Sequence, residues 1–224
     1  MQWFPTRQRI FKYYYPVEFM AALMTSVIDN PGKVSEYIYS CRQMGIKILP
    51  PDINKGEGSF SVDSGNIRYG LAAIKSIGKP VIESIIKERK NGGPFSNLKD
   101  FIERLSGKEV NKRTIESFIK SGAFDSLGGT RKQFMVVYVQ ILDQVNRERK
   151  YSMTGQLSLF DIVSDDQKSE FDIPLPDVGE YEKETKLAFE KEVLGVYLSG
   201  HPLEDYEEKW KKKYIQDDVG FPAG

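Results

Sequence analysis

Four short amphipathic segments, separated by glycine-containing turns, occupy the middle of the chain and restrict its fold more than any other feature. Each repeats apolar residues every three or four positions, which is the period of a helix with one buried face. They cover residues 80–90, 96–105, 111–120 and 130–149. Thr130 and Gln133 fit a capping box, in which each side chain satisfies a backbone N–H at the helix start. The sequence therefore predicts short packed helices in this region.

The residues before 70 predict two further helices and one β-hairpin. Apolar positions in 16–28 and 31–44 follow the helical period, and Asn30 before Pro31 is typical of a helix start. Residues 60–69 alternate apolar and polar on either side of a Ser-Gly-Asn turn, which indicates a hairpin. The predicted fold class is mainly α with a small β-hairpin.

The pattern changes again after residue 150. Helical periodicity is lost where Ser, Asp, Pro and Gly dominate, and it returns near Glu180. This change predicts a linker followed by a helical end. The predicted division of the chain is 1–69, 70–150, 151–179 and 180–224.

Charge is segregated along the chain, although lysine plus arginine and aspartate plus glutamate both number 32. Residues 1–69 carry a net charge of +2, residues 70–150 carry +7 and residues 151–224 carry −9. A basic block is typical of phosphate binding, whereas the acidic end would be repelled by nucleic acid. The alternative is that these charges form an ordinary solvated surface.

Two elements in the basic block repeat the order helix, glycine turn, helix, and each resembles a helix-hairpin-helix motif. In such a motif the unpaired N–H groups and positive dipole end of the second helix meet a DNA phosphate. Such contacts address the sugar-phosphate backbone and give little sequence preference. The alternative is an ordinary helix–helix turn, since glycine is common at helix ends. The predicted DNA-binding residues are Lys75, Ser76, Gly78, Lys79, Gly128, Gly129, Thr130, Arg131 and Lys132.

An apolar pentapeptide lies inside the predicted linker, where no core should need it. Its residues are Gln156, Leu157, Ser158, Leu159 and Phe160. It resembles the peptide with which bacterial proteins dock on the ring-shaped sliding clamp, in which a glutamine amide binds the pocket rim and a Leu-Phe pair fills an apolar pocket. The alternative is that this segment folds back on the chain's own core.

Several kinds of site are not expected in this sequence. One Cys and one His exclude a disulfide framework and a Cys/His zinc site. The pairs Asp165-Asp166 and Asp217-Asp218 are adjacent in acidic stretches rather than spaced to converge on two metals. We predict no catalytic and no metal-binding residue. Because no segment resembles a membrane span or a signal peptide, we expect a cytoplasmic protein without a membrane partner.

Five stretches resemble the alpha subunit of bacterial DNA polymerase III, a C-family replicative polymerase, and they occur in the family's order. These stretches are 15–23 (YPVEFMAAL), 49–54 (LPPDIN), 69–75 (YGLAAIK), 121–125 (SGAFD) and 194–203 (LGVYLSGHPL). The last is characteristic of the form without an inserted exonuclease. The resemblance covers roughly 12–215, whereas the first ten residues depart from it.

The resemblance implies that the chain is an internal piece of the polymerase. Residues 1–69 would belong to the fingers, 70–150 to a tandem helix-hairpin-helix module, 151–179 to a clamp-binding linker, and 180–224 to a helical approach to an oligonucleotide-binding fold. The family's catalytic carboxylates and their Mg²⁺ lie in the palm, so no cofactor and no polymerisation are expected here. The implied partners are duplex primer-template DNA, the β sliding clamp and other replisome subunits.

Two other functions are compatible with the same residues. One is a free-standing helix-hairpin-helix repair or accessory protein, including a small nuclease, and the other is an interaction scaffold without DNA contact. The LPPDIN stretch and the helices before residue 70 favour the polymerase, because an accessory protein would not need them. The basic block argues against the scaffold.

Overall fold

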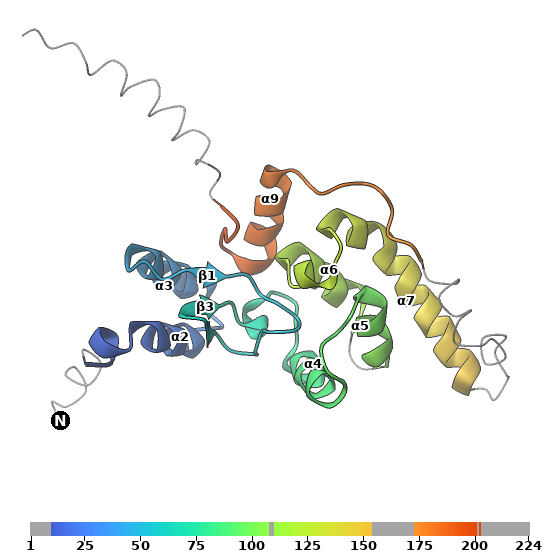
Figure 1. Ribbon diagram of the computed structural model, residues 1–224, viewed down its shortest axis with the longest axis horizontal. Coiled ribbons are helices and arrows are strands. Elements are labelled where there is room, and N and C mark those ends of the chain that lie inside the picture. Colours follow the sequence, from blue (N-terminus) through green and yellow to red (C-terminus); the bar gives the residue numbers. More distant parts are fainter. Residues whose placement is uncertain (1–9, 108–109, 154–172, 201, 203–224) are drawn as a thin grey trace, which may run out of the picture.

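The computed structural model describes residues 10–107, 110–153, 173–200 and 202 (Figure 1). The predicted fold class is confirmed, because short helices dominate and the described residues contain one small sheet. The helices are α2 (Pro16–Ser26), α3 (Pro31–Gln43), α4 (Lys79–Gly92), α5 (Leu98–Arg104), α6 (Lys112–Ser121), α7 (Arg131–Met153) and α9 (Lys183–Leu194). Two 3₁₀ turns, η1 (Leu71–Ala73) and η2 (Asp125–Leu127), precede α4 and α7. No helix among the described residues is long and apolar enough to cross a membrane.

The small sheet lies beside α2 and α3. Strands β2 (Ser61–Asp63) and β3 (Asn66–Arg68) form the predicted hairpin. Strand β1 (Ile48–Leu49) adds to it in parallel, with Ile48 opposite Ile67, so that the strand order is β1-β3-β2. The two residues before Pro50 thus form a third strand beside the hairpin.

Asparagine side chains start three of the helices. Asn30 accepts a hydrogen bond from the backbone N–H of Lys33 at the start of α3. Asn97 and Asn111 cap α5 and α6 in the same way. An Asn cap satisfies one of the four N–H groups left open at a helix start, which contributes about 1 kcal/mol.

The centre of the core is a chain of phenylalanine rings. Phe124 lies 4.9 Å from Phe101, 5.6 Å from Phe118 and 6.3 Å from Phe134, measured between ring centroids. Tilted and edge-to-face aromatic pairs of this kind add to the hydrophobic stabilisation from burial. The rings come from α5, α6, the following turn and α7, so they fix the elements that carry the second hairpin.

One hydrophobic core crosses the predicted boundary at residue 70 and reaches α9. Tyr69 and Leu71, on the two sides of that boundary, are both fully buried. The Tyr69 hydroxyl donates to the carbonyl of Leu194 at 3.0 Å, and the N–H of Lys75 donates to the carbonyl of Val193 at 2.9 Å. In Figure 1, α9 lies next to α6. The last described helix is therefore part of the support of both hairpins.

Candidate nucleic-acid interface

The first hairpin joins η1 to α4 through a short exposed turn. Ser76 has a φ of 69°, a left-handed backbone that lets the chain reverse before Gly78. Gly78 is the N-cap of α4 and makes no side-chain cap hydrogen bond, whereas α3, α5 and α6 each have an Asn cap. Lys79 is exposed at the first helical position, before Pro80, which has no N–H. The amino end of α4 thus presents a positive dipole end and one lysine to solvent.

Lys75 has a structural contact as well as an exposed position. Its ammonium group donates to the backbone carbonyl of Glu192 at 2.9 Å, near the carboxyl end of α9. Cations are favoured at this end of a helix, because the last carbonyl groups carry partial negative charge. The first turn has two predicted cations, Lys75 and Lys79. Among the described residues, only the ammonium group of Lys75 has a hydrogen-bond partner within the chain.

The second hairpin runs from α6 through η2 to α7. Gly122 ends α6 with a φ of 80°, and Gly128 precedes α7 with a φ of 81°. The predicted capping box is confirmed: Gln133 N–H donates to the Thr130 hydroxyl at 3.2 Å, and Thr130 N–H donates to the Gln133 side chain at 2.9 Å. The turn geometry fits the predicted motif, but Thr130 is already used as a cap.

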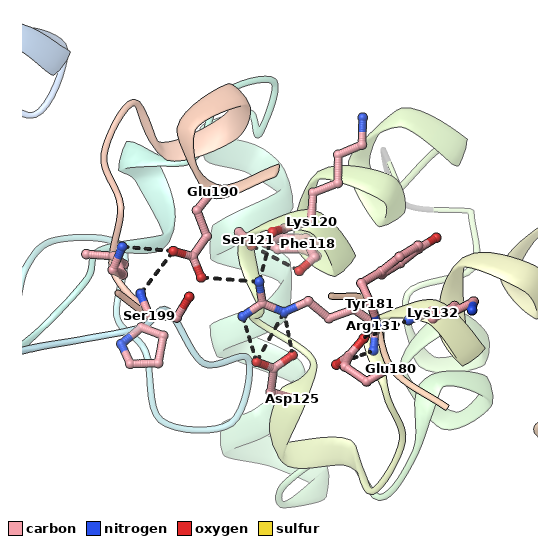
Figure 2. A network of polar contacts seen from close by, with 12 residues as sticks. Phe118, Lys120, Ser121, Asp125, Arg131, Lys132, Glu180, Tyr181, Glu190 and Ser199 are labelled. Atoms are coloured by element: carbon pink, nitrogen blue, oxygen red, sulfur yellow. Dashed lines mark hydrogen bonds and ion pairs between the residues drawn. The ribbon is translucent and has the colours of Figure 1, made fainter. Parts of the chain in front are cut away.

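A carboxylate from elsewhere in the chain closes the same helix end. Glu180 accepts hydrogen bonds from the backbone N–H groups of Arg131 and Lys132, both at 3.3 Å (Figure 2). The Thr130 hydroxyl donates to the Gly179 carbonyl at 2.7 Å. We call residues 173–181 the strap, because this segment crosses the start of α7. The backbone N–H groups of Thr130, Arg131 and Lys132, which the sequence assigned to a phosphate, are therefore occupied within the protein.

The predicted DNA contact of Arg131 would require the side chain to leave its position in this conformation, because that side chain is only 5% exposed. Its guanidinium lies between Asp125, whose Oδ2 is 2.8 Å from Nη2, and Glu190, whose Oε1 is 3.3 Å from Nη1. Burial alone would lower the pKa of Arg131, but the hydrogen bonds and charges of these two carboxylates outweigh it and raise that pKa. Gly122 is required beside it, since a Cβ there would collide with the guanidinium.

Glu190 is a buried residue of this network that the sequence did not predict. It is 1% exposed, and its Oε2 accepts hydrogen bonds from the N–H groups of Leu198 at 2.8 Å and Ser199 at 3.0 Å. The network in Figure 2 thus joins the second turn, α7, α9 and the segment after α9. The sequence does contain an indication that Glu190 is buried. It falls between Leu187 and Leu194 on the apolar face of its helix.

Other arginines of the basic block also serve the fold. Arg89 donates from Nη1 to the carbonyls of Ile53 and Gly56. Arg104 donates to the carbonyl of Glu88 at 2.6 Å. The net charge of +7 therefore overstates the charge that is free to meet a phosphate.

The remaining predicted sites can be placed only in part. Residues 156–160 lie outside the described residues. Within the described ranges, no group of three or more His, Cys, Asp or Glu side chains could hold a metal ion.

Comparison with known proteins agrees with this geometry. A family model described as a helix-hairpin-helix motif matches residues 45–134, which contain the turns of both hairpins. A DNA polymerase III subunit alpha from Mycobacterium tuberculosis is 40% identical over 195 residues, which are 86% of this chain and 16% of the relative. Those of Vibrio cholerae and Escherichia coli are 40% identical over 196 residues, 87% of this chain and 17% of each relative.

The turns and the matching model together show that this chain contains a helix-hairpin-helix motif. Through the sequence match, the chain belongs to the family of bacterial DNA polymerase III alpha subunits. It spans about one sixth of the length of the relatives it matches. That these relatives are polymerase subunits favours the polymerase hypothesis over a free-standing repair protein and over a scaffold.

Proposed function

We propose that this chain supplies non-specific duplex-DNA binding to a replicative DNA polymerase. The observation that carries the proposal is the uncapped amino end of α4, with Lys79 exposed beside it, inside the matched helix-hairpin-helix region. A phosphate at that position would receive backbone N–H donors, the positive end of the helix dipole and the lysine charge. The contact would position primer-template DNA without reading its bases.

The same proposal includes attachment to the β sliding clamp through Gln156, Leu157, Ser158, Leu159 and Phe160. Helix α7 ends at Met153 and the strap begins at residue 173, so the peptide lies in the stretch that joins them. A few large apolar side chains entering a pocket can carry most of the energy of such a contact. Other replisome subunits would be reached through the longer polymerase.

Nucleotide transfer is proposed only for the longer polymerase, with Mg²⁺ held by carboxylates of its palm. The function of this chain is then retention of the enzyme on its substrate. This division of roles follows the resemblance to the family and the duplex-binding proposal.

A fluorescence anisotropy titration of the chain with a labelled duplex tests the DNA-binding proposal. Affinity should fall linearly on a log–log plot against salt, with a slope of about −0.9 for each phosphate contacted, and duplexes of unrelated sequence should bind equally. A flat salt response, or no binding at 50 mM salt, would contradict it.

A further inference from the structure

The amino ends of α4 and α7 differ in a way that the repeated sequence pattern does not predict. No side chain caps α4, whereas α7 holds both the Thr130–Gln133 capping box and the Glu180 carboxylate. Glu180 comes from the acidic part of the chain, 48 and 49 positions away from the two amides it binds. The two hairpins therefore cannot meet a phosphate in the same way.

The position of Glu180 is fixed by contacts on both sides of it. One of its carboxylate oxygens accepts the N–H of Tyr181 at 2.7 Å, and Tyr181 packs edge-to-face on Phe189 of α9 at 5.2 Å. On the other side, the Gly179 carbonyl accepts from Thr130 at 2.7 Å. The strap thus delivers a carboxylate to the first turn of α7 and holds it there.

Further anchors of the strap fall on the same helix turn. The Gln133 amide donates to the carbonyl of Pro176 at 2.9 Å. Leu175 approaches Gly129 so closely that a Cβ on this glycine would come within 3.0 Å of it. Ile173 packs against the hydrophobic core. The strap is therefore seated on the second hairpin over most of its length.

We propose that Glu180 substitutes for a DNA phosphate at the second hairpin, so that the strap and duplex DNA compete for the amino end of α7. A carboxylate and a phosphate both present anionic oxygens, and both are favoured by the same N–H groups and dipole. The two backbone amides cannot serve both anions at once. With the strap in place, the first hairpin alone grips the duplex. This inference rests on the proposed duplex-binding function.

The test compares Glu180→Ala with Glu182→Ala in the full chain. Both variants remove one negative charge, but Glu182 is exposed and makes no side-chain cap hydrogen bond. Removing Glu180 should free the amides of Arg131 and Lys132 for one more phosphate. The salt slope of duplex binding should then steepen by about one in Glu180→Ala. Glu182→Ala should keep the parent slope, since it changes only the long-range field.

A second measurement does not depend on DNA. In ¹⁵N–¹H spectra of Glu180→Ala, titration with inorganic phosphate should shift the Arg131 and Lys132 amide signals and reach saturation. In the parent chain and in Glu182→Ala these two signals should not respond. Equal salt slopes in the two variants, or amides of Glu180→Ala that ignore phosphate, would show that Glu180 is only a helix cap.

The two proposals fail in different ways. If the parent and both variants show no salt-dependent duplex binding, the proposed function is wrong, and the phosphate titration still decides the role of Glu180. If the parent binds duplex while Glu180→Ala and Glu182→Ala behave alike, only the competition is wrong.

Discussion

Arg131 and Glu190 form an almost completely buried ion pair across 59 positions of sequence, with Nη1 3.3 Å from Oε1. Removing one partner of a buried pair is costly, because the other charge stays in a medium of low polarity. Replacing Glu190 would also weaken the hydrogen bonds that its carboxylate accepts from the backbone N–H groups of Leu198 and Ser199. We therefore expect replacement of either partner to lower the free energy of unfolding.

We expect Glu190→Gln to lower the free energy of unfolding by about 3 kcal/mol, because it leaves Arg131 with one carboxylate instead of two. Urea denaturation followed by circular dichroism measures this difference. The matched control is Glu192→Gln, whose exposed ion pair with Lys120 should contribute less than about 1 kcal/mol. If both variants lost the same free energy of unfolding, the buried pair would contribute no more to stability than the exposed one.

Lys79→Glu should weaken duplex binding at least tenfold. The reason is that a hydrogen bond to a charged group contributes about 1.5–3 kcal/mol, and each 1.4 kcal/mol is a factor of ten. Anisotropy titrations should also show a salt slope smaller by about one. Lys87→Glu makes the same charge change about 12 Å further along α4 and is the control. If both variants lose affinity equally, only net charge matters.

The double variant Leu159→Ala and Phe160→Ala should reduce affinity for the β clamp well over tenfold. Each buried apolar side chain is worth roughly 1.5–3 kcal/mol, so two of them exceed the 1.4 kcal/mol that a factor of ten requires. Surface plasmon resonance on immobilised clamp measures the loss. The same double variant should keep the duplex affinity and melting temperature of the parent. The control is the double variant Asp165→Ala and Asp166→Ala, which should bind the clamp as the parent does. Unchanged clamp affinity with a lower melting temperature would assign the peptide to the core.

The thiol of Cys41 should be protected in the native state. It is the only cysteine of the chain, it is fully buried, and burial raises its pKa to about 11 from an ordinary value of 9.0. Because the unfolded thiol ionises at a lower pH than the buried thiol, the free energy of unfolding should fall as pH rises from about 9 to about 11. Ellman's reagent at pH 8 should react at least tenfold faster in denaturant than in buffer. Equal rates would contradict the buried position.

The purified chain should not extend a primer in the presence of template, deoxynucleotides and Mg²⁺. We expect this because the sequence offers no pair of carboxylates spaced to hold the two metal ions of phosphoryl transfer. A gel assay with a labelled primer measures it, and the same chain's duplex binding shows that the sample is folded. Extension by the pure chain would overturn the division of roles.

Local rules predicted the elements that depend on neighbouring residues. The hairpin of β2 and β3, the Asn30 cap and the Thr130–Gln133 box all follow from residues a few positions apart. The clamp peptide and the individual DNA contacts stay predictions. These local features were sufficient to locate both turns of the candidate interface.

Contacts between distant segments decided what local rules could not. Arg131 looks like a free cation in sequence, and only the packing of α9 supplies Glu190 beside it. Glu180 closes α7 from 49 positions away, so no pattern around residue 131 announces it. The parallel pairing of Ile48 with Ile67 is likewise non-local. Counting charges in the sequence therefore missed that Arg131 is already paired within the chain.

The bond between the Tyr69 hydroxyl and the Leu194 carbonyl joins residues 125 positions apart, and it determines when the first hairpin can be completed during synthesis. A ribosome makes the chain from its amino end, so the turn before α4 emerges long before α9 exists. Contacts between residues so far apart in sequence form late, because the intervening chain must be ordered first. A nascent chain stalled before residue 183 would hold both turns, yet Tyr69 and Lys75 would lack their α9 partners. The first hairpin would gain these contacts only after residue 194 has left the ribosome.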